Sequence, residues 1–366
     1  MNGEQYAGIE RVVDILIGAS SLFGYRARLA LLKSRKMVEH MVSKTDVHTF
    51  DMRSRFDLLA YRRVAALARD HGCSMLHSHT VRSALIAAPA ARLADIPWIH
   101  HVHSPALKDS SHWGRNCINF VAEWALIRRA DHVITVSAEL AEYVTTYYGV
   151  LPSRIRLARN GVRQLARQWL VNANGRKTVC VLGAFRPRKG IEVLISAADL
   201  LKERFSQLSF RLVGPFSEDS YEFDIRRQVS LHGLSDRIEF VGFTRDTQKE
   251  LQSCDVFAFP SLYGEGMPMA VLEAMAAGCA IVGTHTPGVT ELLENGAGLL
   301  VEPGDARALA DAIALYLENP HLAERSRVLA RQRQCEQFDE MKMCRSVYEV
   351  YDRAMEQGDK VTFPSA

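Results

Sequence analysis

Several features that would fix the class of a protein at once are missing from these 366 residues. No run approaches the roughly 18 apolar residues of a membrane-spanning helix, and the N-terminus has no apolar signal-peptide core. There is no short-period repeat and no low-complexity segment, so solenoid and fibrous architectures are excluded. Hydrophobic residues at 48% and charged residues at 24% are typical of a soluble globular protein, here long enough for two domains.

Cysteine is sparse and shows no pairing pattern. The seven cysteines are odd in number, scattered and never in a C-x-x-C arrangement; they stand at positions 73, 117, 180, 254, 279, 335 and 344. This pattern argues against a disulfide framework and predicts reduced, buried cysteines in a cytoplasmic protein.

The net charge of +3 hides an asymmetry between the two halves. Residues 1–165 hold 22 Lys and Arg against 14 Asp and Glu, a net +8, whereas the remainder holds 23 against 28, a net −5. A basic first half favours an anionic acceptor or peripheral association with the anionic inner face of the plasma membrane. Ordinary solvated surface charge explains it equally well. Nucleic acid is not expected, because no nucleic-acid motif appears and aromatics do not alternate with the basic residues.

Strands and helices alternate along both halves, which predicts an α/β protein with two doubly wound parallel sheets. In the first half we expect helices over 9–23, 56–73, 83–94, 116–130 and 138–148, and strands over 28–32, 47–52, 75–79, 98–103 and 132–136. In the second half we expect helices over 191–205, 221–231, 247–253 and 306–317, and strands over 178–182, 210–213, 238–241, 256–259, 280–283 and 298–301.

The polar segment 161–177 is the candidate linker between these halves. The expected domains are therefore an N-terminal Rossmann-like domain over 1–163 and a C-terminal one over 164–338. Residues 339–366 would form a last helix and a disordered tail.

The richest pattern of functional residue types lies in a glycine-rich stretch of the second half. Glu265 stands between Gly264 and Gly266, in a loop that glycine allows to approach a ligand closely. Apolar residues at helical spacing begin at Met267, so Glu273 is expected about two turns into a helix. A helix N-terminus favours anions, and two carboxylates can accept hydrogen bonds from sugar and ribose hydroxyls. The stretch therefore predicts a nucleotide-sugar site.

A basic loop, GAFRPRKG, follows the first strand of the second half and contains Gly183, Arg186 and Lys189. A cation here can neutralise a diphosphate and stabilise its departure. A basic surface loop without function is the alternative. Gly214 and Gly242 end the next two strands, on the side where doubly wound sheets bind ligands.

The run EGMPMAVLEAMAAG resembles the E-x7-E signature of family 4 retaining glycosyltransferases, and the loop GAFRPRKG resembles their G-x-x-x-x-x-K-G segment. The resemblance implies the GT-B fold, in which two Rossmann-like domains face a cleft and a C-terminal helix crosses back to the first domain. It implies that Glu265 holds the transferred sugar, Glu273 the ribose, and Arg186 and Lys189 the phosphates. The residues implied to line the donor are Gly8, Gly183, Gly214, Gly242, Gly264, Gly266 and Met267.

The activity implied is transfer of a hexose from a nucleoside-diphosphate sugar, with retention, to a glycan or lipid-linked acceptor in surface polysaccharide or glycolipid assembly. No cofactor and no essential metal are expected. Three alternatives stay open: an epimerase-type enzyme, a phosphorylase, and a non-catalytic binding subunit of the same fold. The first would need no acceptor, the second needs a cofactor lysine that we do not find, and the third would bind donor without turnover.

Histidines gather at two strand ends of the first half: His77 and His79 on one, His100, His101 and His103 on the other. The family resemblance selects His103 as the histidine beside the transferred sugar. The rival is a zinc site, because H-x-H pairs on neighbouring strands can ligate zinc. Since no acidic cluster stands beside these histidines, we expect no metal.

The beginning of the chain departs from the family pattern. One glycine, Gly8, stands where relatives commonly have two, and Arg163 follows N-G-V where Asp is usual. Relatives also begin with a buried apolar strand, whereas residues 1–6 are mostly polar or glycine. We therefore expect that the native product starts upstream, or that this chain is a truncated and marginally stable form.

Overall fold

The computed structural model describes residues 1–4, 6–33, 36–52, 57, 59–109, 112–165 and 177–358. The chain divides into two compact units, which we call unit 1 (Met1–Asn160 with Glu340–Ala366) and unit 2 (Gly161–Asp339). The division falls at Asn160, against the expected 163, and the last helix groups with unit 1. Most of the candidate linker and nearly all of the expected tail lie outside the described residues.

Unit 2 contains a six-stranded parallel sheet in the order β12-β11-β10-β7-β8-β9. Its strands are β7 (Lys177–Leu182), β8 (Leu208–Val213), β9 (Ile238–Gly242), β10 (Val256–Phe259), β11 (Ala280–Thr284) and β12 (Leu299–Val301). Its helices are η5 (Pro187–Lys189), α6 (Ile191–Leu201), α7 (Asp219–Leu231), α8 (Thr247–Gln252), α9 (Met269–Ala277), α10 (Pro287–Leu293), η6 (Glu294–Gly296), α11 (Ala306–Glu318) and α12 (Pro320–Gln337).

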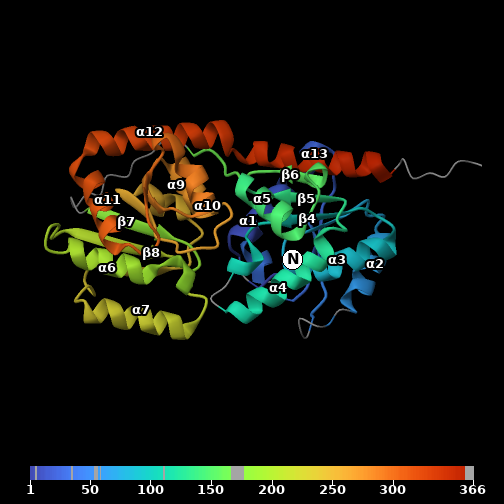
Figure 1. Cartoon of the computed structure of the whole chain (residues 1–366), viewed down its shortest axis with the longest axis horizontal. Helices are drawn as coiled ribbons and strands as arrows, with labels where there is room; N and C mark the ends of the chain where they lie inside the picture. The colour runs from blue at the N-terminus through green and yellow to red at the C-terminus, as the bar shows by residue number, and fades with distance from the viewer. Residues whose placement is uncertain are drawn as a thin grey trace, which may run out of the picture. The chain divides into compact units, whose positions relative to one another are not determined.

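The strand order reverses between β7 and β10, because the chain first moves outward through β8 and β9 and then returns. Figure 1 shows α6 and α7 on one side of this sheet and α9 and α10 on the other, as right-handed crossovers in opposite directions require. Strands β10 and β11 are fully buried, which is why they read as continuous apolar runs. Such a reversal is where doubly wound sheets bind their ligands.

Unit 1 contains two separate parallel sheets, β1-β2 and β3-β4-β5-β6. The strands are β1 (Arg28–Leu31), β2 (Asp46–Thr49), β3 (Leu76–Ser78), β4 (Trp98–Val102), β5 (His132–Thr135) and β6 (Ile155–Leu157). The helices are α1 (Gly8–Ala19), η1 (Ser20–Phe23), η2 (Lys36–His40), α2 (Ala60–Asp70), α3 (Val81–Ala94), η3 (Ala106–Lys108), α4 (Trp113–Ile127), α5 (Ala138–Tyr148), η4 (Pro152–Arg154) and α13 (Glu340–Gly358).

No strand among the described residues joins β1 to β3. Instead the backbone of the first residues runs beside the end of β1: the Met1 amino group donates to the Ala30 carbonyl at 3.0 Å, and Leu32 N–H donates to the Met1 carbonyl at 2.9 Å. Met1 and Leu31 pack in the same small apolar cluster. The first residues thus supply part of the backbone pairing on this side of β1 without forming a strand.

The α/β class with two parallel-sheet units agrees with the sequence expectation, but the short helices η2 to η6, one strand and two α-helices were missed. Strand β6 has only three residues, and α10 was read as a turn because it opens on Pro287-Gly288. Helix α12 was missed because its inward residues are small or polar rather than apolar; those buried are Ala323, Ser326, Ala330 and Gln334. A helix with such a face gives no hydrophobic periodicity.

Candidate functional site

The carboxyl ends of β7, β8 and β9 carry one glycine each: Gly183, Gly214 and Gly242. Gly183 N–H donates to the Val213 carbonyl at 3.0 Å, and Gly214 N–H donates to the Gly242 carbonyl at 2.8 Å. A Cβ on Gly214 would lie 1.9 Å from the Gly183 carbonyl oxygen, and φ at Gly214 is +133°. Only glycine fits at Gly214, so the turns at these strand ends pack closely together without side chains.

The basic loop after β7 packs directly on the loop after β10. Gly190, with φ of +66°, approaches Pro260 so closely that a Cβ would lie 2.1 Å from the Pro260 carbonyl oxygen. The Arg188 carbonyl accepts hydrogen bonds from the N–H of Leu262 at 2.8 Å and from the Ser261 hydroxyl at 3.2 Å. The backbone therefore holds the two loops together at the reversal of the sheet.

Glu265 is the centre of the site. Its Oε1 accepts hydrogen bonds from Arg188 Nη1 at 2.7 Å, Lys189 Nζ at 2.7 Å and Ser261 Oγ at 2.6 Å, and the side chain is buried. Arg188 Nη1 also lies 3.3 Å from the Tyr263 carbonyl and 3.4 Å from that of Gly264. No donor to Oε2 of Glu265 is found in the part of the chain that the structure describes. One oxygen is therefore fixed, and the other can accept from a ligand.

Burial and neighbouring charges have opposing effects on the pKa values of Glu265 and Lys189. Burial alone would raise the pKa of the Glu265 carboxyl, yet the Lys189 and Arg188 charges and the hydrogen bonds lower it to about 2. Burial, aided by the charges of Arg188 and Arg186, lowers the pKa of Lys189 to about 8 against the attraction of Glu265. At neutral pH Glu265 is therefore an anion, and Lys189 a cation that loses its proton readily.

Helix α9 carries the second carboxylate. It begins at Met269 rather than Met267, so Glu273 lies little more than one turn into the helix instead of the expected two. Glu273 is buried, and its Oε2 accepts a hydrogen bond from Thr247 Oγ1 at 3.0 Å. The glycine loop before α9 is backed by α10, where a Cβ on Gly288 would lie 1.9 Å from the Gly266 carbonyl oxygen.

A buried carboxylate held by two cations thus lies where the sheet order reverses, and a second buried carboxylate follows on α9. This arrangement suits a phosphorylated sugar. Family models match successive parts of the chain: Glycosyltransferase Family 4 over residues 6–164 and Glycosyl transferases group 1 over residues 162–333. A phosphatidyl-myo-inositol mannosyltransferase of Mycobacterium leprae is 30% identical over 298 residues, covering 72% of this chain and 76% of that protein. The chain belongs to glycosyltransferase family 4.

Two further comparisons agree with membership of family 4. A glycogen synthase of Mycobacterium tuberculosis is 28% identical over 304 residues, covering 79% of this chain and 71% of that protein. The crystal structure of HepE from Anabaena in complex with UDP and glucose matches with a TM-score of 0.82 at 21% identity, covering 96% of this chain and 98% of that one. The fold is GT-B, and the protein is a glycosyltransferase of the hexosyltransferase type.

The structure of this family 4 enzyme brings together some of the expected site residues and leaves others apart. Glu265 and Lys189 meet, whereas Arg186 is directed to Ser217, whose Oγ accepts from Arg186 Nε at 3.0 Å. Arg188, which the family pattern did not select, makes the direct contact with Glu265. Its signal was its place beside Lys189, but spacing alone cannot say which arginine of the basic loop turns inward.

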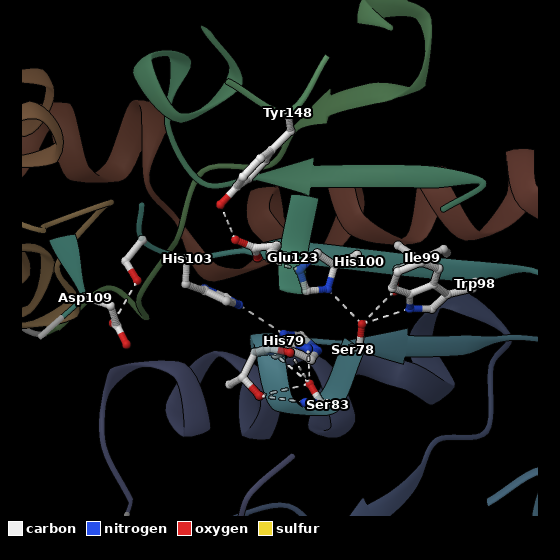
Figure 2. Close-up of polar contacts among 12 residues, drawn as sticks. Ser78, His79, Ser83, Trp98, Ile99, His100, His103, Asp109, Glu123 and Tyr148 are labelled. Carbon is white, nitrogen blue, oxygen red and sulfur yellow. Dashed lines mark hydrogen bonds and ion pairs between the residues drawn. The ribbon is translucent and has the colours of Figure 1, made fainter. Parts of the chain in front are cut away.

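Three further expected residues are Gly8 and His103 of unit 1 and Met267 of unit 2. Gly8 begins α1 and is exposed, and Met267 of unit 2 is buried. His103 follows β4, and its Nε2 lies 3.1 Å from Nδ1 of His79, as Figure 2 shows. No contact of His103 speaks for or against the sugar-binding role implied for it, so that role stays a prediction.

A second polar cluster in unit 1 lies on the opposite face of β4. Figure 2 shows His100 between Ser78 and Glu123: Nδ1 is 2.8 Å from Ser78 Oγ, and Nε2 is 3.0 Å from Glu123 Oε1. Tyr148 donates its hydroxyl to Glu123 Oε2, and Trp98 Nε1 donates to Ser78 Oγ at 2.9 Å. All of these side chains are buried.

Across the described part of the chain, no helix is long and apolar enough to cross a membrane.

Proposed function

We propose that this enzyme transfers a hexose from a nucleoside-diphosphate sugar to an acceptor hydroxyl, with retention of the anomeric configuration. The observation that supports it best is the Glu265 cluster at the reversal of the unit 2 sheet. One carboxylate oxygen of Glu265 is fixed by two cations and a hydroxyl. A carboxylate fixed through one oxygen is rigid, and its other oxygen can accept from the hydroxyls of a sugar.

In this proposal the donor lies along the carboxyl ends of β7, β8 and β9. The base and ribose rest against the glycine turns at Gly183, Gly214 and Gly242, where no side chain stands in the way. Glu273 accepts from the ribose hydroxyls. The diphosphate faces the basic loop, where Lys189 and Arg186 supply the positive charge that a divalent cation supplies in other transferases. Transfer would then need no essential metal.

The chemical step breaks the bond between the anomeric carbon and the diphosphate oxygen and forms a bond from that carbon to the acceptor oxygen. The acceptor hydroxyl proton passes to the departing diphosphate oxygen on the same face of the sugar, so atoms and charge balance. Lys189 stabilises the negative charge that grows on the diphosphate. Glu265 holds the sugar in place, and the role of His103 beside the sugar stays a prediction.

We propose a glycan or lipid-linked acceptor, used in surface polysaccharide or glycolipid assembly at the inner face of the plasma membrane. The two curated relatives are named for glycogen and for phosphatidyl-myo-inositol. Helix α4 of unit 1 supports a membrane-associated acceptor, because one of its faces is exposed and apolar; the side chains are Trp113, Ile118, Val121 and Trp124. Exposed arginines border this face, and Arg128 stacks on Trp124 at 4.2 Å. A helix of this kind suits an anionic bilayer surface.

The donor proposal is tested with a panel of UDP, GDP and ADP sugars in a thermal-shift assay, followed by transfer to bacterial lipid and glycan fractions. We expect one base to stabilise the protein, transfer only when acceptor is present, an unchanged anomeric configuration by NMR, and activity that survives EDTA. Conversion of the donor sugar without acceptor would instead identify an epimerase. Donor binding with no turnover on any fraction would identify a binding subunit.

The membrane proposal is tested by sedimentation with vesicles. We expect binding to vesicles that contain anionic lipid, weak binding to neutral ones, and loss of binding in a Trp113→Ser/Val121→Ser variant. The matched control is Leu231→Ser, an exposed apolar residue at the end of α7 in unit 2. Equal binding by both variants would contradict a membrane role for α4.

A further inference from the structure

Four histidines of unit 1 gather on one face of the β3-β4 pair. The two strands are parallel neighbours, with His77 opposite Ile99 and Ser78 opposite His100. Alternation along each strand puts His77 and His79, and likewise His101 and His103, on the face opposite His100. The ring centroids of His77 and His79 are 4.1 Å apart, and those of His77 and His101 are 5.4 Å apart.

Several ring nitrogens in this cluster are buried and lack a hydrogen-bond partner. Both nitrogens of His101 and Nε2 of His77 are in this state among the described residues, and His101 is fully buried. A buried polar atom without a partner destabilises the fold, and several such atoms in one place are rare in native proteins. A metal ion bound among these rings would satisfy the nitrogens, because imidazole nitrogen is a common metal ligand.

The remaining nitrogens are held in the way that metal-binding histidines require. Nδ1 of His77 lies 2.6 Å from the Tyr351 hydroxyl on α13, and Nδ1 of His79 lies 3.1 Å from Nε2 of His103. Each contact occupies one nitrogen and directs the other, as the outer partners of ligating histidines do. Figure 2 shows the His79–His103 contact.

We propose that unit 1 binds one transition-metal ion, with zinc as the best fit, through His77, His79 and His101. One ligand atom from each lies within 4.8 Å of the others. Zinc–nitrogen bonds of about 2.1 Å in a tetrahedron put nitrogens about 3.4 Å apart, so modest rotations of the rings complete the site. Three neutral nitrogen ligands suit zinc and leave a fourth position open.

This metal is separate from the proposed transfer chemistry, in which cations of unit 2 neutralise the diphosphate. Its effect is local to unit 1: it ties β3 to β4 and removes the penalty of unpartnered nitrogens. A metal on Nε2 of His79 also fixes the proton on Nδ1, so that His79 donates to Nε2 of His103. The site would exist whether or not the proposed donor and acceptor are correct.

The test uses the full-length, tag-free chain, stripped with chelator and titrated with zinc. We expect one ion per chain by elemental analysis, a rise in the thermal transition, and visible d–d bands of low-symmetry Co²⁺ when cobalt replaces zinc. His101→Phe keeps the ring volume and should weaken zinc binding by about 100-fold or more, whereas Tyr351→Phe should weaken it by about 10- to 100-fold.

The matched control is His132→Phe on the neighbouring strand β5. His132 is also buried, and both of its nitrogens also lack a partner within the described part of the chain, but it lies outside the cluster. We expect it to bind zinc as the wild type does. Failure of the wild-type chain to bind zinc would overturn the proposal. Unchanged zinc binding by a folded His101→Phe chain would overturn it as well. So would an equal loss of zinc binding in His101→Phe and His132→Phe. If His101→Phe fails to fold, Tyr351→Phe and cobalt spectra of the wild type decide.

Discussion

Replacing Glu265 by glutamine tests whether the buried carboxylate, rather than its hydrogen bonds alone, holds the donor site together. The amide oxygen can still accept from Arg188, Lys189 and Ser261, but the negative charge is gone. A carboxyl whose pKa falls from 4.5 to about 2 stabilises the fold by about 3 kcal/mol above pH 4.5. Removing one member of a buried ion pair typically costs about 3–5 kcal/mol, so both arguments predict a loss of about 3 kcal/mol in unit 2.

The assay is chemical denaturation at pH 7, with hydrogen exchange at β7 and β10 assigning the transition to unit 2. The control is Glu294→Gln, because Glu294 pairs with Arg333 at 3.0 Å but its side chain is 52% exposed. We expect that control to lose under about 1 kcal/mol. The folded pKa of Glu265 is depressed, so its contribution is complete above pH 4.5 and is lost as pH falls toward 2. Equal losses in the two variants, or an unchanged acid dependence in Glu265→Gln, would refute the reasoning.

Three further predictions concern the donor site. Glu273→Ala should weaken nucleoside diphosphate binding, measured by calorimetry, by roughly 10- to 150-fold, since a hydrogen bond to a charged acceptor contributes ~1.5–3 kcal/mol. Glu265→Ala should lose less affinity for the nucleotide, because its main defect should be in the rate of transfer. Arg188→Ala should lower kcat, though less than Lys189→Ala, because both side chains hold Glu265 but only Lys189 is also proposed to face the diphosphate. A fully active Arg188→Ala chain would contradict the contact with Glu265 as a functional one. If Lys189 must be protonated to face the diphosphate, kcat/KM should fall as pH rises through about 8, and a profile flat to pH 10 would contradict this.

The sequence predicted most of unit 2 because its strands are buried on both faces and its helices are amphipathic. A continuous apolar run marks a buried strand such as β10, and apolar residues at helical spacing mark a helix such as α6. Where burial uses small or polar side chains, as in α12, the pattern carries no such signal. Pro287-Gly288 reads as a turn, although proline also suits the first turn of a helix, where its missing N–H is not needed.

The site shows the same division between what spacing can tell and what it cannot. Glu265 and Glu273 were found because their interval and flanking glycines form a pattern. The choice between Arg186 and Arg188 depends on which side chain turns toward the loop after β10, and only the tertiary contacts of Arg188 with that loop reveal it. The histidines were recognised at two strand ends, but their cluster also needs β3 and β4 to be direct neighbours. Neighbouring order in a sheet is a tertiary fact that local spacing does not contain.

The cluster of Ser78, His100 and Glu123 shows why geometry must be weighed with access. A serine, a histidine and a carboxylate in hydrogen-bonded order resemble a hydrolase triad, but here the serine meets Nδ1 and the carboxylate Nε2, the reverse of the catalytic arrangement. Yet all three are at most 3% exposed, so no substrate can reach the serine. These hydrogen bonds hold α4 against β4 through Glu123, whose second carboxylate oxygen accepts from the Tyr148 hydroxyl of α5. The opposite face of α4 is apolar and exposed. Because the buried polar contacts of Glu123 hold the helix in place, this exposed face is rigid.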